Sequence, residues 1–172
     1  MIIDKLHRYL ENGTILGLLE DQSKWDSLII NRRKPHTYRI FTWLNNDRIC
    51  LHMFNVCDKH EAFSHPHPWP AVFKILKGAY RMSLGRSPDR KSDPVPISEL
   101  IMTTGSYYSI EDPLVWHSVI PLHVTYTVML NESPWDTTIA HTKVRTTKGK
   151  DLDKIDENEL KAFLAVFKGL LL

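Results

Sequence analysis

Residues 123–130 have the sequence HVTYTVML, in which side chains of different character alternate. Successive residues of a β-strand point to opposite faces, so such alternation predicts a strand. One face carries Val124, Tyr126, Val128 and Leu130, and the other carries Thr125, Thr127 and Met129. This segment is the clearest strand in the chain, and it indicates a sheet with a buried face.

Similar short runs, separated by Pro, Asn, Asp and Gly, extend from about Tyr38 to Thr146. Many short strands with frequent turn residues are typical of a sandwich or a barrel. We therefore predict an all-β fold, with residues 85–96, rich in Ser, Pro and Asp, as a loop that is the best candidate for a flexible insertion. The other expected strands are Tyr38–Leu44, Arg48–Val56, Ala71–Leu84, Ser98–Thr103, Ser106–Ile110, Trp116–Ile120 and Thr138–Thr146.

Helical patterns occupy the two ends of the sequence. Apolar residues recur at helical spacing from Ile2 to Leu10, with Gly13 as a stop signal and Thr14 as the cap of a second helix. Near the other end, Asp156 and Glu159 resemble a capping box before an amphipathic run. We predict one domain over 1–172, with N-terminal helices in 1–34, a β-barrel in 36–146 and a C-terminal helix in 152–172. The helices are expected to pack outside the barrel, although the last helix can also serve as a homodimer contact.

The composition excludes several classes of protein. A formal net charge of +2 and a hydrophobic content of 42% are ordinary for a soluble globular protein. They give no reason to expect nucleic acid or a membrane as a partner. The first ten residues lack the uninterrupted apolar core of a secretory signal, and Cys50 and Cys57 cannot form a disulfide framework. A cytoplasmic location is the simplest expectation.

The motif His65-Pro66-His67-Pro68-Trp69-Pro70 is the strongest chemical signal. In an extended backbone, residues two apart point to the same side, so His65 and His67 can reach one metal ion. The prolines cannot donate ladder hydrogen bonds, which places the pair at a strand end or edge. His117 follows much later, and a closed sheet can bring it to the same interior. The alternative is that the pair consists of loop residues stiffened by prolines.

The chain resembles the cupin superfamily at these residues. The run from His65 through Gly78, with Tyr80 beyond it, is similar to the first cupin motif, and Gly105, Pro113 and His117 are similar to the second. The resemblance covers roughly 48–131 and is nearest to small bacterial and phage cupins without an assigned function. It implies a double-stranded β-helix, or jelly-roll barrel, with one divalent metal ion on the three histidines.

One departure from the cupin pattern concerns the acidic ligand. The usual glutamate is replaced by Ala71 or Val72, and Glu61 and Glu111 are the acidic residues that can substitute for it from nearby loops. The sequence does not choose between these two or require either of them.

Three neutral imidazoles leave a divalent ion with its full charge, which favours an anionic small-molecule substrate. Fe(II) is favoured over Zn, Mn or Ni, because thiol dioxygenases among the cupins use a similar three-histidine set. The leading hypothesis is therefore an Fe(II) dioxygenase acting on a small thiol or carboxylate. A zinc isomerase or hydrolase, and a cupin that has lost its metal and binds a small ligand or a protein, remain alternatives.

Several residues near the histidines are candidates for supporting roles. Trp69 and Trp116 are candidates for the pocket wall, with core packing as the alternative for both. His52 lies in an alternating strand and can face the pocket, although a hydrogen-bonded structural histidine is the commoner use. Tyr80, Arg81 and Tyr126 are the candidates for orienting a substrate.

Overall fold

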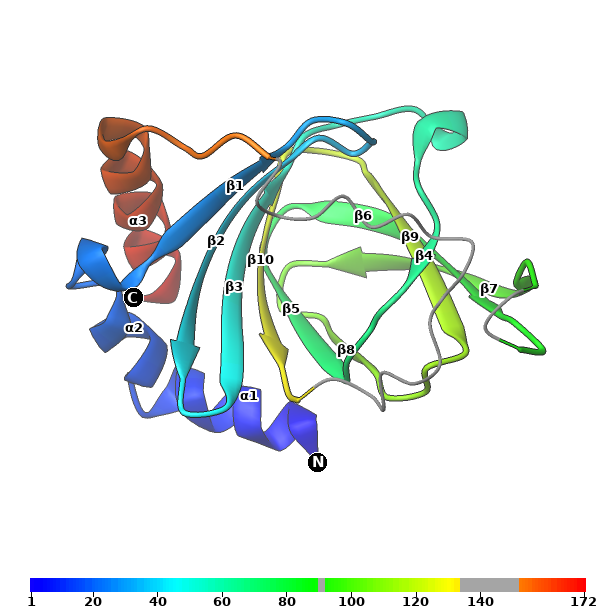
Figure 1. Ribbon diagram of the computed structural model, residues 1–172, viewed down its shortest axis with the longest axis horizontal. Helices are drawn as coiled ribbons and strands as arrows, with labels where there is room; N and C mark the ends of the chain where they lie inside the picture. Colours follow the sequence, from blue (N-terminus) through cyan, green and yellow to red (C-terminus); the bar gives the residue numbers. More distant parts are fainter. Residues whose placement is uncertain (90–91, 134–151) are drawn as a thin grey trace.

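The computed structural model describes residues 1–89, 92–133 and 152–172. Its strands form two antiparallel sheets that face each other (Figure 1). The six-stranded sheet has, in spatial order, β1 (Asp26–Ile30), β2 (Thr37–Leu44), β3 (Asp47–Phe54), β10 (Thr125–Asn131), β5 (Ala71–Lys77) and β8 (Tyr107–Ile110). The four-stranded sheet has β4 (His65–Pro66), β9 (Val115–Pro121), β6 (Ala79–Arg86) and β7 (Val95–Thr103).

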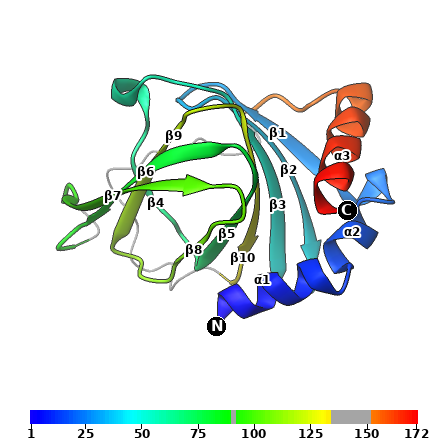
Figure 2. The same ribbon diagram turned by 180° about the vertical axis from the view of Figure 1, so that it is seen from behind.

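The helices lie on the outer face of the six-stranded sheet, on the side away from the second sheet (Figures 1 and 2). They are α1 (Ile2–Glu11), α2 (Thr14–Leu18) and α3 (Glu157–Leu171), with short 3-10 turns η1 (Gln22–Lys24) and η2 (Lys59–Glu61). The Asp156 side chain caps α3 by accepting a hydrogen bond from the Glu159 N–H at 2.9 Å. The predicted all-β, cupin-like arrangement with helices packed outside is confirmed. None of the helices in these ranges has the length and apolar character needed to cross a bilayer.

Both faces of the six-stranded sheet are buried. Its outer face and the helices share the largest core cluster, which includes Ile40, Ile49, Leu51, Val128, Leu130, Phe163 and Phe167. Smaller clusters fill the space between the sheets, with Phe73 and Met129 in one and Ile75, Tyr80 and Met82 in another. The alternation predicted for 123–130 is therefore confirmed, with Val128 and Leu130 toward the helices and Met129 toward the second sheet.

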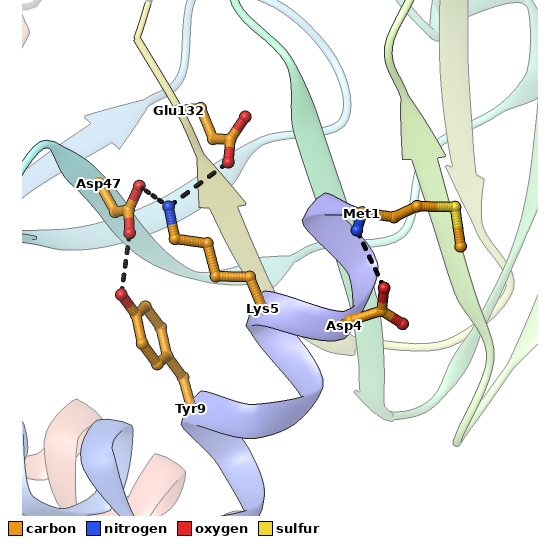
Figure 3. A network of polar contacts seen from close by, with 6 residues as sticks. All are labelled: Met1, Asp4, Lys5, Tyr9, Asp47 and Glu132. Atoms are coloured by element: carbon orange, nitrogen blue, oxygen red, sulfur yellow. Dashed lines mark hydrogen bonds and ion pairs between the residues drawn. The ribbon is translucent and has the colours of Figure 1, made fainter.

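Polar contacts fix α1 to the end of the six-stranded sheet (Figure 3). Lys5 Nζ lies 2.7 Å from Asp47 Oδ1 and 3.4 Å from Glu132 Oε1. The Tyr9 hydroxyl donates to Asp47 Oδ2 at 2.9 Å. Asp47 is buried, so its charge needs these partners, and together they set the position of the helix on the sheet.

The segment predicted as one strand over 71–84 is two strands, one in each sheet. Gly78, with φ +96°, separates β5 from β6. A Cβ at this position would lie 2.7 Å from Thr125 Oγ1 and 2.8 Å from the Val124 carbonyl oxygen, so the turn requires glycine. The chain therefore crosses from the six-stranded to the four-stranded sheet at Gly78.

Other differences concern the limits of elements. The prediction that 1–34 is helical was wrong for Asp26–Ile30, which forms β1 and pairs with β2. This run is short and mostly apolar, a pattern that periodicity cannot assign, and the pairing decides it. The expected loop at 85–96 is shorter, because β6 continues to Arg86 and β7 begins at Val95. The strand predicted over 138–146 lies outside the described residues.

Candidate metal centre

Two strands of the four-stranded sheet bring the histidines together. In the β4–β9 pairing, His65 is directly opposite His117, and Pro66 is opposite Trp116. His67 follows β4 two residues after His65, so both side chains project to the same side. The strand-edge position that the prolines imply is confirmed, because β4 has two residues and lies at the edge of its sheet.

The three imidazoles converge on a common centre. His67 Nε2 lies 2.9 Å from His117 Nε2. The ring centroids are 4.8 Å apart for His65 and His117 and 5.2 Å apart for His65 and His67. One nitrogen from each of the three rings lies within 4.8 Å of the others. These are the side chains that the motif spacing predicted, and they form a group able to hold a metal ion.

The separation of the two Nε2 atoms fits metal binding. Two nitrogens that each lie about 2.1 Å from an ion, at a right angle to one another, are about 3.0 Å apart. The Nδ1 atom of His65 lies 3.3 Å from the Phe63 carbonyl oxygen, which leaves its Nε2 for an ion. Nδ1 of His117 is buried without a hydrogen-bond partner, so aromatic neighbours rather than an acceptor hold that ring.

Burial keeps these imidazoles uncharged. It lowers the pKa of His117 to about 4, and it also holds the pKa values of His65 and His67 well below the usual range, together with the repulsion that a protonated His117 would exert on them. At neutral pH each ring is therefore neutral and carries a lone pair on one nitrogen, which is the form that binds metal. The donor set fits a divalent cation.

Aromatic side chains surround the centre. The Phe63 ring stacks on His65, with centroids 5.5 Å apart, and Phe73 meets His67 edge-on at 5.4 Å. Tyr108 stacks on the other side of Phe73 at 4.5 Å. These rings limit access of water, which strengthens electrostatic interactions inside the cavity.

The histidines lie at one side of a small cavity between the sheets. It offers about 60 Å³ to the centres of water-sized molecules, which is room for a few small groups. Its apolar lining includes Ile30, Phe54, Val119 and Met129. Three cationic residues, Arg33, Lys34 and Arg39, also line it, and within the described ranges no Asp or Glu does.

The residues expected to orient a substrate lie outside this lining. Tyr126 faces the helices, with its ring 5.7 Å from Phe167, and Arg81 forms an ion pair with Glu99 at 3.4 Å. Tyr80 is buried between the sheets and donates a hydrogen bond to the Tyr108 hydroxyl at 2.9 Å, so it acts on the cavity only through Tyr108.

Neither tryptophan is among the lining residues. Trp69 packs against the core cluster around Cys50, and Trp116 is buried elsewhere. The two tryptophans therefore do not wall the pocket, and its aromatic wall is formed by Phe54, Phe63 and Phe73. Glu61 and Glu111, the two expected substitutes for the missing glutamate, are both exposed. Glu61 forms an ion pair with Lys34, and Glu111 accepts a hydrogen bond from the Ser109 hydroxyl.

Sequence reasoning missed Arg39 and Tyr108 and left His52 undecided. Arg39 is on β2 and His52 is directly opposite it on β3, and both line the cavity. In the sequence, strand alternation places Arg39 on the same face as Thr37 and on the opposite face from Ile40. This alternation was the available signal that Arg39 faces the cavity. A single arginine in an alternating strand is usually a solvated residue, so this signal was weak.

No protein-family model matches the chain, and no curated protein does. Similar solved structures include Fe(II) HppE, which is 14% identical to this chain with a TM-score of 0.42. The match covers 54% of this chain and 50% of the HppE chain. Hydroxypropylphosphonic acid epoxidase from S. wedmorenis is 12% identical, with a TM-score of 0.47 and coverage of 62% and 55%. An RmlC-like cupin from Shewanella frigidimarina is 14% identical, with a TM-score of 0.45 and coverage of 66% and 89%. The chain thus spans about half of the first two, and likeness at these scores carries over no activity.

Proposed function

We propose that the protein is a metal-dependent cupin enzyme, an Fe(II) oxygenase that acts on a small anionic substrate with a thiol or carboxylate group. The observation that carries the proposal is the convergence of His65, His67 and His117, with Nε2 of the last two 2.9 Å apart. These three nitrogens would hold Fe(II) and would leave it able to bind a substrate and dioxygen as well.

The residues around the centre suit this chemistry. Three neutral imidazoles do not offset the charge of a divalent ion, so an anionic ligand is favoured beside it. The lining adds cationic side chains and, within the described ranges, no carboxylate, which favours the same kind of ligand. The aromatic rings of Phe63 and Phe73 shield the reacting groups from bulk water.

The test is metal analysis of protein purified without oxygen, followed by oxygen uptake with a panel of small thiols and carboxylates. We expect close to one iron per chain, and substrate-dependent uptake that His67→Ala abolishes. His123→Ala is the matched control, because His123 is exposed and belongs to no metal-binding group among the described residues. Folded protein that binds no metal, or that binds zinc and takes up no oxygen, would overturn the proposal.

One observation favours a second candidate, a binding module without metal. The 2.9 Å separation of the two Nε2 atoms also suits a hydrogen bond between neutral imidazoles, so the pocket can be complete without an ion. In that case, metals added to the protein would not raise its melting temperature, and a small anion would.

A further inference from the structure

Arg39 is half-buried beside the cavity, and it has no acidic partner among the described residues. Its Nε donates a hydrogen bond to His52 Nε2 at 2.8 Å, and among the described residues no carboxylate forms an ion pair with it. Burial lowers the pKa of Arg39 to about 10, so the guanidinium stays charged at neutral pH. A charge that is partly removed from water costs free energy unless an opposite charge lies close to it, so an anionic ligand in the cavity would stabilise this guanidinium.

A chain of hydrogen bonds fixes this guanidinium. Because Nε2 of His52 accepts from Arg39, Nδ1 carries the ring proton and donates to Thr127 Oγ1, 3.2 Å away. Burial and the charge of Arg39 hold the pKa of His52 well below its usual value, so the ring remains a neutral acceptor. The His52 ring also stacks on Phe54, with centroids 5.3 Å apart. Arg39 is therefore oriented, and its two terminal nitrogens are left for another acceptor.

The other cations of the lining have neighbours of their own. Lys34 Nζ lies 3.6 Å from a Glu61 carboxylate oxygen, and the Arg33 guanidinium lies 4.6 Å from the centre of the Phe63 ring. Arg33 and Arg39 line the same cavity as the three histidines, and the charges of both arginines contribute to the low pKa of His65. Arg39 differs from Arg33 in that a hydrogen bond to a neighbouring side chain orients its guanidinium, which favours Arg39 as the cation for a ligand that also reaches the histidines.

We propose that Arg39 binds the carboxylate of a short, mainly apolar substrate through its terminal nitrogens, with His52 as a positioning residue. This inference rests on the proposed function, in which the opposite end of the substrate reacts at the metal centre. A planar guanidinium fork matches a carboxylate in a bidentate arrangement. The cavity of about 60 Å³ and the apolar residues Ile30 and Val119 restrict the rest of the molecule to a few carbon atoms.

The experiment uses the full chain with its metal removed by chelation, and propionate as the probe. We expect propionate to bind about 10–100-fold more tightly than neutral propionamide, as measured by titration calorimetry, because hydrogen bonds between charged groups are stronger than those to a neutral group. Arg39→Met should abolish this preference, and Arg39→Lys should retain part of it. Arg81→Met is the matched control, because Arg81 pairs with Glu99 outside the cavity lining and should change nothing.

His52 variants separate positioning from packing. In His52→Gln the side-chain oxygen can still accept from Arg39, so propionate binding should be largely kept. His52→Leu fills similar space without an acceptor, and it should weaken propionate binding several-fold while the variant stays folded by circular dichroism. Equal propionate binding in these two variants would overturn the positioning role.

The outcomes also separate this inference from the proposed function. A preference for propionate in metal-free protein that depends on Arg39, found without oxygen uptake, supports the carboxylate site and removes the oxygenase. Equal binding of propionate and propionamide overturns the carboxylate site, even if iron-dependent uptake is found. Tighter binding of inorganic phosphate than of propionate also overturns it.

Discussion

The two walls of the cavity are built in different ways. The histidine wall, formed by His65, His67 and His117, comes from β4 and β9 of the four-stranded sheet. The arginine wall, formed by Arg39 and His52, comes from β2 and β3 of the six-stranded sheet, and Thr127 of β10 accepts a hydrogen bond from His52. The first consists of neutral donors suited to a cation, and the second presents a fixed cation suited to an anion. Under the two proposals, one small cavity would bind a cation and an anion together, because the residues suited to each lie on different sheets.

The largest expected effect comes from the point where the chain passes between the sheets. Gly78→Ala should lower the free energy of unfolding by about 3 kcal/mol, because it adds a positive-φ penalty to a close contact with Thr125. Urea unfolding measures the loss. Both walls should be affected, so metal and propionate binding should weaken together.

Gly169→Ala is the matched control for this variant. Gly169 lies in α3 with no atom within 4 Å of an added Cβ, so the same substitution should be neutral or stabilise by up to about 1 kcal/mol. Equal stability of Gly78→Ala and the parent protein would show that the turn does not couple the walls.

Acid should destabilise the folded protein through the buried histidines of both walls. His117 has a folded-state pKa of about 4 against 6.5 for the free side chain, so the unfolded chain binds more protons between these values. Stability is therefore complete above about pH 6.5 and falls with pH, by about 2 kcal/mol at pH 5 from His117 alone. His52, His65 and His67 act in the same direction.

Urea unfolding of metal-free protein at neutral and mildly acidic pH measures this dependence. His117→Gln should flatten the pH profile, whereas Arg39→Met should keep most of it. A parent protein with the same stability at both pH values would contradict the assignment of buried neutral histidines.

A smaller effect is expected at the hydrogen bond that joins the sheets. Tyr80 of β6 donates to Tyr108 of β8, and Tyr108→Phe would leave the buried Tyr80 hydroxyl without its acceptor. We expect a loss of about 1–2 kcal/mol in the free energy of unfolding. Tyr80→Phe in the same background should recover part of the loss, and thermal unfolding of the parent protein and the two variants checks this. No recovery of stability in the double variant would mean that the lost hydrogen bond does not cause the destabilisation.

The smallest expected effect is the influence of the arginine wall on metal binding. Arg39→Met should change metal affinity by less than about threefold, because the walls do not share ligands. The direction should be toward tighter binding, since the charge of Arg39 opposes a cation nearby. Competition with a chelator gives the affinity. A large loss of metal in this variant would show that the walls are not independent.

The two walls also differ in how far they could be predicted. The histidine wall was found because two ligands are two residues apart and strand alternation applies locally. The arginine wall depends on the pairing of β2 with β3, and no short sequence motif predicts that pairing. Alternation showed that Tyr126 shares a face with Val128 and Leu130, but both faces of this sheet are buried. It therefore could not tell which face was the inner one, and Tyr126 was assigned to the wrong side.

The architecture was easier to predict than its details. Short alternating runs and a capped amphipathic tail indicated an all-β fold with outer helices. The break at Gly78 was missed because the apolar run continues through it, and the positive φ depends on the contact with Thr125. β1 was missed because five residues are too few for a period to be recognised.

The placement of Arg39 and the histidines on separate sheets has a consequence for how such a protein can diversify. Under the two proposals, a substitution at position 39 would change which head group is recognised and leave the metal-binding group intact. A substitution at position 65, 67 or 117 would remove the proposed chemistry and leave a receptor for the same small acid. An enzyme and a binding protein with one shared ligand preference would then differ by a single substitution in this scaffold.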